Sequence, residues 1–344
     1  MKILRTAVIG LGRTGWNRHV PNIVSHDGFE LVAAMDTSPE RMAEFETKYG
    51  LPVYDNITDM LKSEKPDLVI VASPTHFHKE HIITSMEFGA DVFAEKPVAK
   101  DIDEVYEIRD AAKRMGRKIM VFQPHRANAV VNTLKKIFEE NKIGKLHMIK
   151  RADTSYVRRN DWQALKKYGG GMLNNYGAHY IDQLRYLTGE DLRVLSCTCD
   201  RVATCGDAED VVQIIMKSES GIALDVNISQ AAAYPITSWM AFGEYGTVFA
   251  EEEFCEEFKV KYIVPEECPP IELQSTLAAK GRTYSSEPPL PWHEETVKVE
   301  PSAAIDFYVK CHEYFAEDKE PFVPFEQSVR LMEILDEGHK AAQL

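Results

Sequence analysis

Residues 5–15 read RTAVIGLGRTG, a short apolar run that leads directly into three glycines. The order G-x-G-x-x-G between a strand and a helix is typical of loops that bind the pyrophosphate of a dinucleotide. Gly10 permits a tight turn, Gly12 lets the backbone approach a phosphate, and Gly15 lets the next helix pack close to the strand. The amides that begin this helix would face the phosphates. The expected cofactor contacts of the loop are Gly10, Leu11, Gly12, Arg13, Thr14 and Gly15.

An acidic residue indicates which dinucleotide the loop binds. Residues 31–35 form a second apolar run, and Asp36 follows it. A carboxylate at this point can accept hydrogen bonds from the adenosine ribose of NAD, and it repels the 2′-phosphate of NADP. We therefore expect NAD as the cofactor, with NADP as the alternative.

Length and charge limit the possible classes of protein. The chain has 344 residues, which suggests two domains, and its net charge is -14. This charge argues against nucleic acid or an anionic membrane as the main partner. No apolar run is long enough to span a membrane, and residues 1–5 lead into the first strand without room for a signal peptide. We expect a cytoplasmic protein.

The six cysteines form no C-x-x-C pair. Cys197, Cys199 and Cys205 offer a conceivable zinc set, but free thiols in a reducing compartment are the favoured interpretation. His76, His78 and His81 do not lie on one helix face, so we expect cofactor lining or helix capping there and no metal.

Strands and helices alternate regularly as far as residue 122. Examples are the apolar run 67–72, the predicted helix 76–88 and the predicted strand 91–94. This alternation predicts an α/β fold with a doubly wound parallel sheet. We expect an N-terminal Rossmann domain over residues 1–123.

Residues 124–344 follow a different pattern. Long runs between residues 194 and 251 alternate polar and apolar side chains, which predicts an antiparallel meander. Stretch 265–291 is proline-rich and predicts a loop, and helices are expected at about 301–315 and 325–342. We expect a C-terminal α+β domain with a large, mostly antiparallel open sheet, whose last helices pack back on the first domain.

Ligands of an open parallel sheet bind beyond the carboxyl ends of its strands. Lys96 follows the fifth strand, where its ammonium could hydrogen-bond a substrate hydroxyl and polarise the carbonyl that forms from it. The alternative is a solvated lysine in a loop. Further cofactor contacts are expected from the residues at the same edge of the sheet: Ser73, Pro74, Thr75, His78, Glu95, Lys96 and Arg126.

A second cluster spans residues 169–185, GGGMLNNYGAHYIDQLR. Asn175, His179 and Asp182 have the i, i+4, i+7 spacing that places them on one helix face. His179 suits proton transfer near neutral pH, and Asp182 could orient its ring. The alternative is a buried histidine with a purely structural role.

Together these motifs resemble the Gfo/Idh/MocA family of sugar and polyol oxidoreductases. The resemblance rests on the glycine loop, SPTHFH at 73–78, EKP at 95–97, Arg126, the stretch from GGG to HxxD, and GEYGTVFAEE at 243–252. It implies a Rossmann domain joined to an open-sheet domain that packs into a homodimer or homotetramer. Lys96 and His179 match the family's lysine and histidine.

One position departs from the family pattern. Many members carry an aspartate four residues before the histidine, where this chain has Asn175. An amide cannot take up a proton as a carboxylate does. Three possibilities stay open: Asp182 compensates, Lys96 is the base, or the chemistry differs.

We expect hydride transfer between NAD and a secondary alcohol of a sugar, polyol or sugar derivative. Two other classes stay open: an enzyme that retains NAD and breaks glycosidic bonds through transient oxidation, and a nucleotide-dependent regulatory protein. The sequence specifies neither the substrate nor the direction of reaction. Arg159 and Asp161 are further pocket candidates, and the expected substrate contacts are Lys96, Tyr156, Arg158, Trp162, Asn175 and His179.

Overall fold

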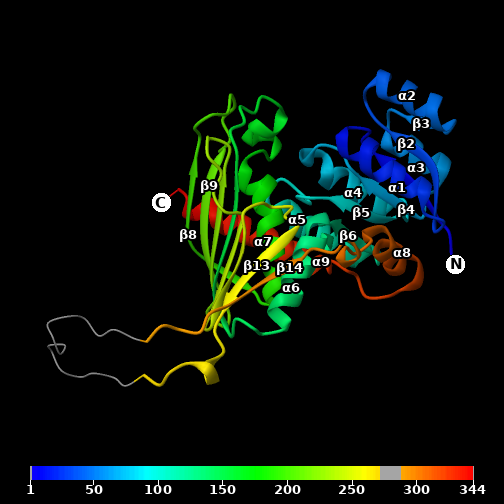
Figure 1. Cartoon of the computed structure of the whole chain (residues 1–344). Coiled ribbons are helices and arrows are strands. Elements are labelled where there is room, and N and C mark those ends of the chain that lie inside the picture. The colour runs from blue at the N-terminus through cyan, green and yellow to red at the C-terminus, as the bar shows by residue number, and fades with distance from the viewer. Residues whose placement is uncertain (1, 272–287, 344) are drawn as a thin grey trace.

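The computed structural model describes residues 2–271 and 288–343, and it places two β-sheets side by side (Figure 1). The first sheet has the strand order β3-β2-β1-β4-β5-β6, and all its strands are parallel. This is the predicted doubly wound arrangement, in which the strand order reverses between β1 and β4. Its strands are β1 (Leu4–Ile9), β2 (Phe29–Met35), β3 (Val53–Tyr54), β4 (Leu68–Val71), β5 (Asp91–Glu95) and β6 (Ile119–Phe122).

Local sequence explains where the surrounding helices begin and end. Ser38 caps α2 by accepting a hydrogen bond from the amide of Arg41, Pro39 occupies the first turn, and Gly50 ends the helix in a left-handed conformation. Pro21 lies in the first turn of α1. The helices of this half are α1 (Val20–Ser25), α2 (Pro39–Tyr49), α3 (Ile57–Glu64), α4 (His78–Glu87) and α5 (Ile102–Met115).

The second sheet has eight strands in the order β14-β13-β12-β11-β7-β10-β9-β8. Neighbouring strands are antiparallel except for β7 and β10, which are parallel. The large, mostly antiparallel sheet is therefore confirmed. Its strands are β7 (Leu146–Thr154), β8 (Leu192–Asp200), β9 (Val211–Ser218), β10 (Ala223–Ser229), β11 (Trp239–Gly243), β12 (Gly246–Ala250), β13 (Glu257–Tyr262) and β14 (His293–Lys298).

The sequence analysis did not predict β13 and β14. Both are rich in charged residues, and β13 buries only Phe258 and Val260. Between the two strands, the described part of the predicted loop contains a short 3-10 turn, Pro265–Glu267. The rest of that predicted loop, residues 272–287, lies outside the described residues.

The remaining helices are α6 (Ala129–Glu139), α7 (Ala178–Thr188), α8 (Phe307–Glu317) and α9 (Phe325–Ala341). Helix α8 begins later than predicted because Asp306 caps it by accepting hydrogen bonds from the amides of Tyr308 and Val309. Its buried face, which includes Phe307 and Phe315, joins the apolar core of the parallel sheet. None of the helices within the described ranges is long and apolar enough to cross a membrane.

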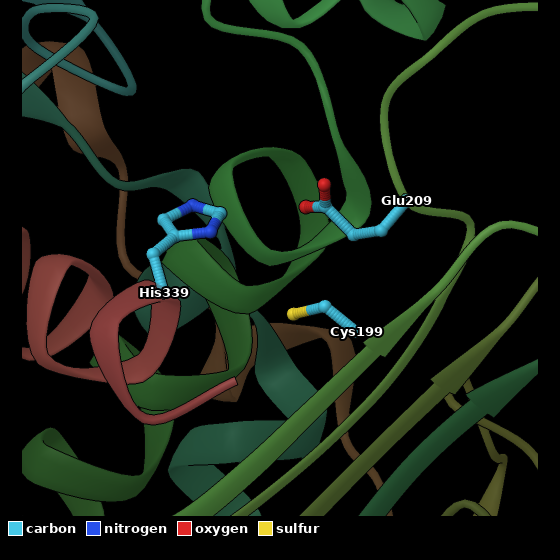
Figure 2. A group of neighbouring side chains, drawn as sticks. All are labelled: Cys199, Glu209 and His339. Carbon is cyan, nitrogen blue, oxygen red and sulfur yellow. The ribbon is translucent and has the colours of Figure 1, made fainter. Parts of the chain in front are cut away.

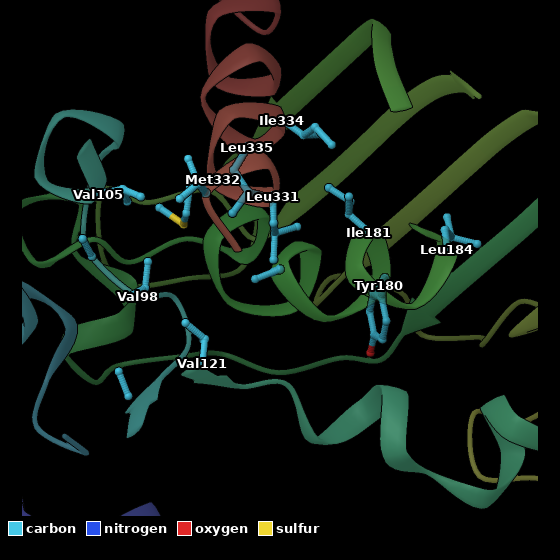
Figure 3. Packing of buried hydrophobic residues seen from close by; sticks show 14 of the residues in the cluster. Val98, Val105, Val121, Tyr180, Ile181, Leu184, Leu331, Met332, Ile334 and Leu335 are labelled. Atoms are coloured by element: carbon cyan, nitrogen blue, oxygen red, sulfur yellow. The ribbon is translucent and has the colours of Figure 1, made fainter. Parts of the chain in front are cut away.

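Helix α9 lies between the two halves of the molecule. Figure 3 shows Leu331, Met332 and Leu335 of α9 between side chains of the parallel sheet's half, such as Val98, and side chains of α7, such as Ile181. These residues belong to one continuous apolar cluster. The edge of the parallel sheet that carries the predicted site thus faces α7 across a packed interface.

Candidate active site

The glycine loop has a shape that fits a dinucleotide phosphate. A Cβ atom on Gly15 would lie 1.8 Å from the carbonyl oxygen of Gly10, so the helix can approach the strand only with glycine there. A Cβ atom on Gly12 would have no heavy atom nearer than 4.0 Å. The protein itself therefore does not require glycine at position 12, and the open space above it suits a phosphate group. The helix begins with a π-helical turn, Gly15–His19, and continues as α1.

Asp36 lies beside this loop and is buried. Its Oδ2 accepts a hydrogen bond from the amide of Leu11 (2.7 Å), and its Oδ1 accepts one from the amide of Ser38 (2.9 Å). A guanidinium nitrogen of Arg41 lies 3.5 Å from Oδ2. The carboxylate has the position expected for a ribose contact. Arg41, which the sequence analysis missed, adds a positive charge of the kind that accommodates a 2′-phosphate.

The segment after β4 is fixed by histidines. The ring nitrogens of His78 lie 2.7 Å from the carbonyl oxygen of Ser73 and 2.9 Å from that of Pro97. His78 is buried, so it links the ends of β4 and β5 and has no ring nitrogen left for the cofactor, contrary to our expectation. His81 forms a hydrogen bond with the hydroxyl of Ser73 at 2.9 Å, and the ring of His76 lies 4.6 Å from that of Tyr168, tilted by 36°. The three imidazoles have separate partners and do not converge.

Lys96 follows β5, and the Lys96–Pro97 peptide bond is cis. The ammonium of Lys96 donates hydrogen bonds to Oδ1 of Asn175 (2.9 Å) and to its carbonyl oxygen (3.0 Å). Burial lowers the pKa of Lys96 to about 8. The carboxylate of Glu95 opposes this shift, whereas the charges of Arg13 and Arg159 add to it. The structure thus brings Lys96 and Asn175 into contact from distant parts of the chain.

A buried chain of polar groups lies behind Lys96. Glu95 is 3.1 Å from Nε2 of His19, and Nδ1 of His19 is 3.0 Å from the hydroxyl of Tyr308. Burial disfavours the carboxylate of Glu95, but the hydrogen bond and charge of His19, together with Lys96, outweigh it and lower the pKa of Glu95. Glu95 therefore faces His19 and the backbone amide of Lys96. The sequence analysis found neither His19 nor Tyr308.

Asn175 does not lie in a regular α-helix. Residues Leu173–Gly177 form a π-helical turn, and α7 begins only at Ala178. The side-chain amide nitrogen of Asn175 donates to Oε1 of Gln163 (3.1 Å) while its oxygen accepts from Lys96. Gln163 is a further residue that the sequence analysis missed.

His179 is buried, with 8% of its surface exposed, and its ring stacks on His125 with a centroid distance of 3.8 Å and an interplanar angle of 9°. Its Nδ1 has no hydrogen-bond partner among the described residues. Burial, together with the nearby charges of Lys96 and His125, lowers the pKa of His179 well below its usual range. The imidazole is therefore neutral at pH 7 and can accept a proton. His125 follows β6 next to Arg126, where the rule about strand ends places ligands, but it was not among the predicted site residues.

Asp182 and Arg126 do not contribute to this site as predicted. Nε of Arg126 donates to Oδ2 of Asp182 at 3.0 Å, Nη2 donates to Oδ1, and both side chains are buried. Arg126 also donates to the carbonyl oxygen of Phe322. Asp182 therefore does not orient His179, and Arg126 is held in an ion pair that joins α7 to the C-terminal segment.

The polar segment before the GGG run is linked to Lys96 through Arg159 and Gln163. Arg159 donates hydrogen bonds to Asp161 (3.1 Å) and to Gln163, and Gln163 in turn contacts Asn175. Tyr156 and Arg158 are exposed. Trp162 is half-buried in a 3-10 turn, Trp162–Ala164. Of the predicted pocket residues in this segment, Arg159 and Asp161 are thus tied to the Lys96 cluster through Gln163.

Two family profiles match the chain. Residues 4–123 match the profile described as "Oxidoreductase family, NAD-binding Rossmann fold", and residues 131–249 match "GFO/IDH/MocA C-terminal domain". The chain belongs to the Gfo/Idh/MocA family. Its first half is thus an NAD-binding Rossmann domain of this family, and the C-terminal match covers β7 to β11 and most of β12 of the second sheet.

Several relatives have been named. The chain is similar to D-glucoside 3-dehydrogenase from Escherichia coli (strain K12), with 29% identity over 54% of each chain. It is also similar to myo-inositol 2-dehydrogenase from Thermotoga maritima, with 25% identity over 72% of this chain and 75% of the relative. The matches span only 59% and 54% of the first two curated relatives.

The fold is shared with solved structures. The WlbA dehydrogenase from Bordetella pertussis, in complex with NADH and UDP-GlcNAcA, superposes with a TM-score of 0.78 at 22% identity and covers 100% of this chain and 97% of its own. In this chain, Asn175 presents a neutral oxygen to Lys96.

Proposed function

We propose that this Gfo/Idh/MocA protein is an NAD-dependent dehydrogenase that acts on a secondary alcohol of a sugar, polyol or sugar derivative. The observation that carries the proposal is the contact between Lys96 and Asn175 at the end of β5, with the neutral His179 close enough for its pKa to respond to the charge of Lys96. When bound at the glycine loop, NAD supplies the hydride acceptor.

Lys96 orients the reacting oxygen. Its ammonium has three donors, and Asn175 occupies two of them. The third donates to the substrate oxygen, where the positive charge stabilises the negative charge that develops as the alcohol loses its proton.

His179 takes the proton. Because its pKa is lowered, the imidazole is in the base form across the neutral range. Its stack on His125 fixes the plane of the ring, and the unpaired Nδ1 can serve as a hydrogen-bonding group that the substrate or a water completes. Asn175 positions Lys96 and takes no part in the proton transfer.

The substrate class is supported by the relatives and by the polar groups beside Lys96. D-glucoside 3-dehydrogenase, myo-inositol 2-dehydrogenase and glucose-6-phosphate 3-dehydrogenase carry names that specify ring alcohols. Arg159 and Gln163 offer hydrogen-bonding groups next to Lys96 that suit the neighbouring hydroxyls of such a ring.

The first test is NADH absorbance after the purified protein is mixed with NAD and a panel of sugars, glycosides, inositols and polyols. We expect absorbance to rise with at least one ring alcohol and NAD to bind more tightly than NADP. Lys96→Ala should lower kcat/KM by about 100-fold or more, with the affinity for NAD changed less than about twofold because Lys96 acts on the substrate oxygen.

Lys100→Ala is the matched control, since Lys100 is exposed and pairs with Glu104 at 3.0 Å. It should leave both quantities unchanged. Equal losses of turnover and NAD affinity in Lys96→Ala would contradict the role given to Lys96. Bound NAD without NADH formation across the whole panel would contradict the free-cofactor dehydrogenase.

A further inference from the structure

Three potential metal ligands converge on one point outside the candidate active site. Cys199 lies on β8, Glu209 precedes β9, and His339 lies near the end of α9. Figure 2 shows the three side chains pointing toward one another, and their ligand-type atoms all lie within 4.8 Å of one another. We propose that this cluster binds a zinc ion, and that the ion fixes the turn that carries Asn175.

The ligand chemistry favours zinc over a hard cation. Thiolate, imidazole and carboxylate are the donors that Zn²⁺ takes in proteins, whereas Mg²⁺ and Ca²⁺ take oxygen ligands. A thiolate and a carboxylate together balance the charge of a divalent ion. The sequence analysis favoured free thiols over a zinc set of Cys197, Cys199 and Cys205. Cys205 is exposed, and the sequence alone does not place Glu209 and His339 beside Cys199.

Cys197 is a fourth possible ligand, and the distance between its sulfur and that of Cys199 suits a tetrahedral zinc ion. Two thiolates at about 2.3 Å from one zinc are about 3.8 Å apart when the geometry is tetrahedral. The Sγ atoms of Cys197 and Cys199 are 3.9 Å apart. This spacing suits Cys197 as the fourth ligand beside Cys199.

Hydrogen bonds hold Glu209 and His339, the two proposed ligands that do not lie on β8. The amide of Leu173 donates to Oε1 of Glu209 at 3.1 Å, and no other hydrogen bond to this carboxylate occurs among residues 2–271 and 288–343. Nε2 of His339 lies 3.0 Å from Oδ1 of Asn174, which leaves Nδ1 to face an ion. Such contacts to the outer ring nitrogen are typical of metal-binding histidines.

The third glycine of the GGG run supports the same site. Gly171 has φ +114°, and a Cβ atom there would lie 2.2 Å from Oε1 of Glu209. Glycine at this position therefore makes room for the Glu209 carboxylate. Leu173 and Asn174, which contact the cluster, directly precede Asn175, the residue that holds Lys96.

The test is zinc binding by the full chain. The purified protein is treated with a chelator, and zinc is titrated back in competition with a chromophoric chelator. We expect one equivalent per chain and a rise in the melting temperature. Cobalt in place of zinc should give a thiolate-to-metal charge-transfer band. Cys199→Ser and His339→Gln should weaken zinc binding at least tenfold, and Cys199→Ser should weaken the cobalt charge-transfer band because one of the two thiolates is lost. Cys205→Ser, which changes an exposed thiol outside the cluster, should retain both.

Absence of stoichiometric zinc binding by the unmodified chain would overturn the proposal, and this measurement does not depend on the folding of any variant. Unchanged zinc binding in a folded Cys199→Ser protein would also overturn it. The outcome is independent of the proposed dehydrogenase, because zinc affinity is measured without substrate or NAD.

Discussion

Lys96 is held by two oxygen atoms of Asn175, and neither oxygen carries a formal charge. Burial lowers the pKa of Lys96 to about 8, and the neutral oxygens of Asn175 add no charge to the opposing effect of Glu95. A carboxylate in place of the Asn175 amide would stabilise the ammonium, because opposite charges at this distance favour the ionised form. A carboxylate at position 175 would therefore widen the pH range in which Lys96 is charged.

Asn175→Asp should raise the pKa of Lys96. Activity that requires the ammonium is present below its pKa and is lost as the pH rises through it. The alkaline limb of the kcat/KM profile should therefore begin near pH 8 in the unmodified protein and move upward by about one unit or more in the variant. Asn227→Asp on β10 adds the same charge outside the Lys96 cluster and should leave the limb in place. If neutral Lys96 were the active form, activity would instead rise as the pH passes through its pKa, and Asn175→Asp would move that rise upward.

The residues of the candidate site differ in how far the sequence could predict them. Lys96 follows a strand and carries a recognisable motif, so the rule about strand ends locates it. His19 lies 76 positions from Glu95 and 289 from Tyr308, and only the packing of α8 on the parallel sheet brings the three together. The prediction for Asp182 was wrong for a different reason. Its helical spacing suggested a contact with His179, but its carboxylate is paired with the buried Arg126.

At the scale of elements, the parallel sheet was predictable because each strand is a continuous apolar run, as burial on both faces requires. Strands β13 and β14 could not be predicted in this way, because they lie at the edge of the second sheet and charged residues fill their exposed face. The π-helical turn Leu173–Gly177 was also missed, because helical spacing in the sequence does not distinguish a π turn from an α-helix. That turn changes which residues face Lys96.

Gly171→Ala tests how the GGG run supports this turn. The new methyl group would meet the Glu209 carboxylate, and the backbone is left-handed there, so we expect the free energy of unfolding to fall by about 2–4 kcal/mol. Gly189→Ala is the matched control, since Gly189 also has a positive φ (+69°) but an added Cβ would meet nothing within 4 Å. Gly189→Ala should lower the free energy of unfolding by only about 1 kcal/mol. Denaturant unfolding measures the stability of both variants. Equal losses of unfolding free energy would show that the contact with Glu209 adds nothing to the cost of placing alanine in a left-handed backbone conformation.

At the scale of the whole molecule, α9 joins the two sheets into one structure. Its side chains belong to an apolar cluster that includes Val69 of the parallel sheet and Ile214 of the second sheet. Ion pairs add to the link: Lys113 of α5 lies 3.1 Å from Glu326, and Arg330 lies 3.0 Å from Asp191, next to β8. Because the same helix packs against both halves, neither sheet can separate from α9 without exposing part of a shared core.

Leu331→Ala should therefore destabilise both sheets together. Leu331 is 2% exposed, and removing a buried leucine side chain costs about 2–5 kcal/mol. Hydrogen exchange followed by mass spectrometry should show the slowest amides of β4 and of β9 losing the same protection, because they exchange through one shared unfolding event. Val24→Ala truncates a side chain that is 55% exposed and should change protection by less than about 0.5 kcal/mol. Lost protection in β9 with β4 unchanged would instead mean that α9 belongs to the second sheet alone, and that the Lys96–Asn175 contact spans an interface able to open.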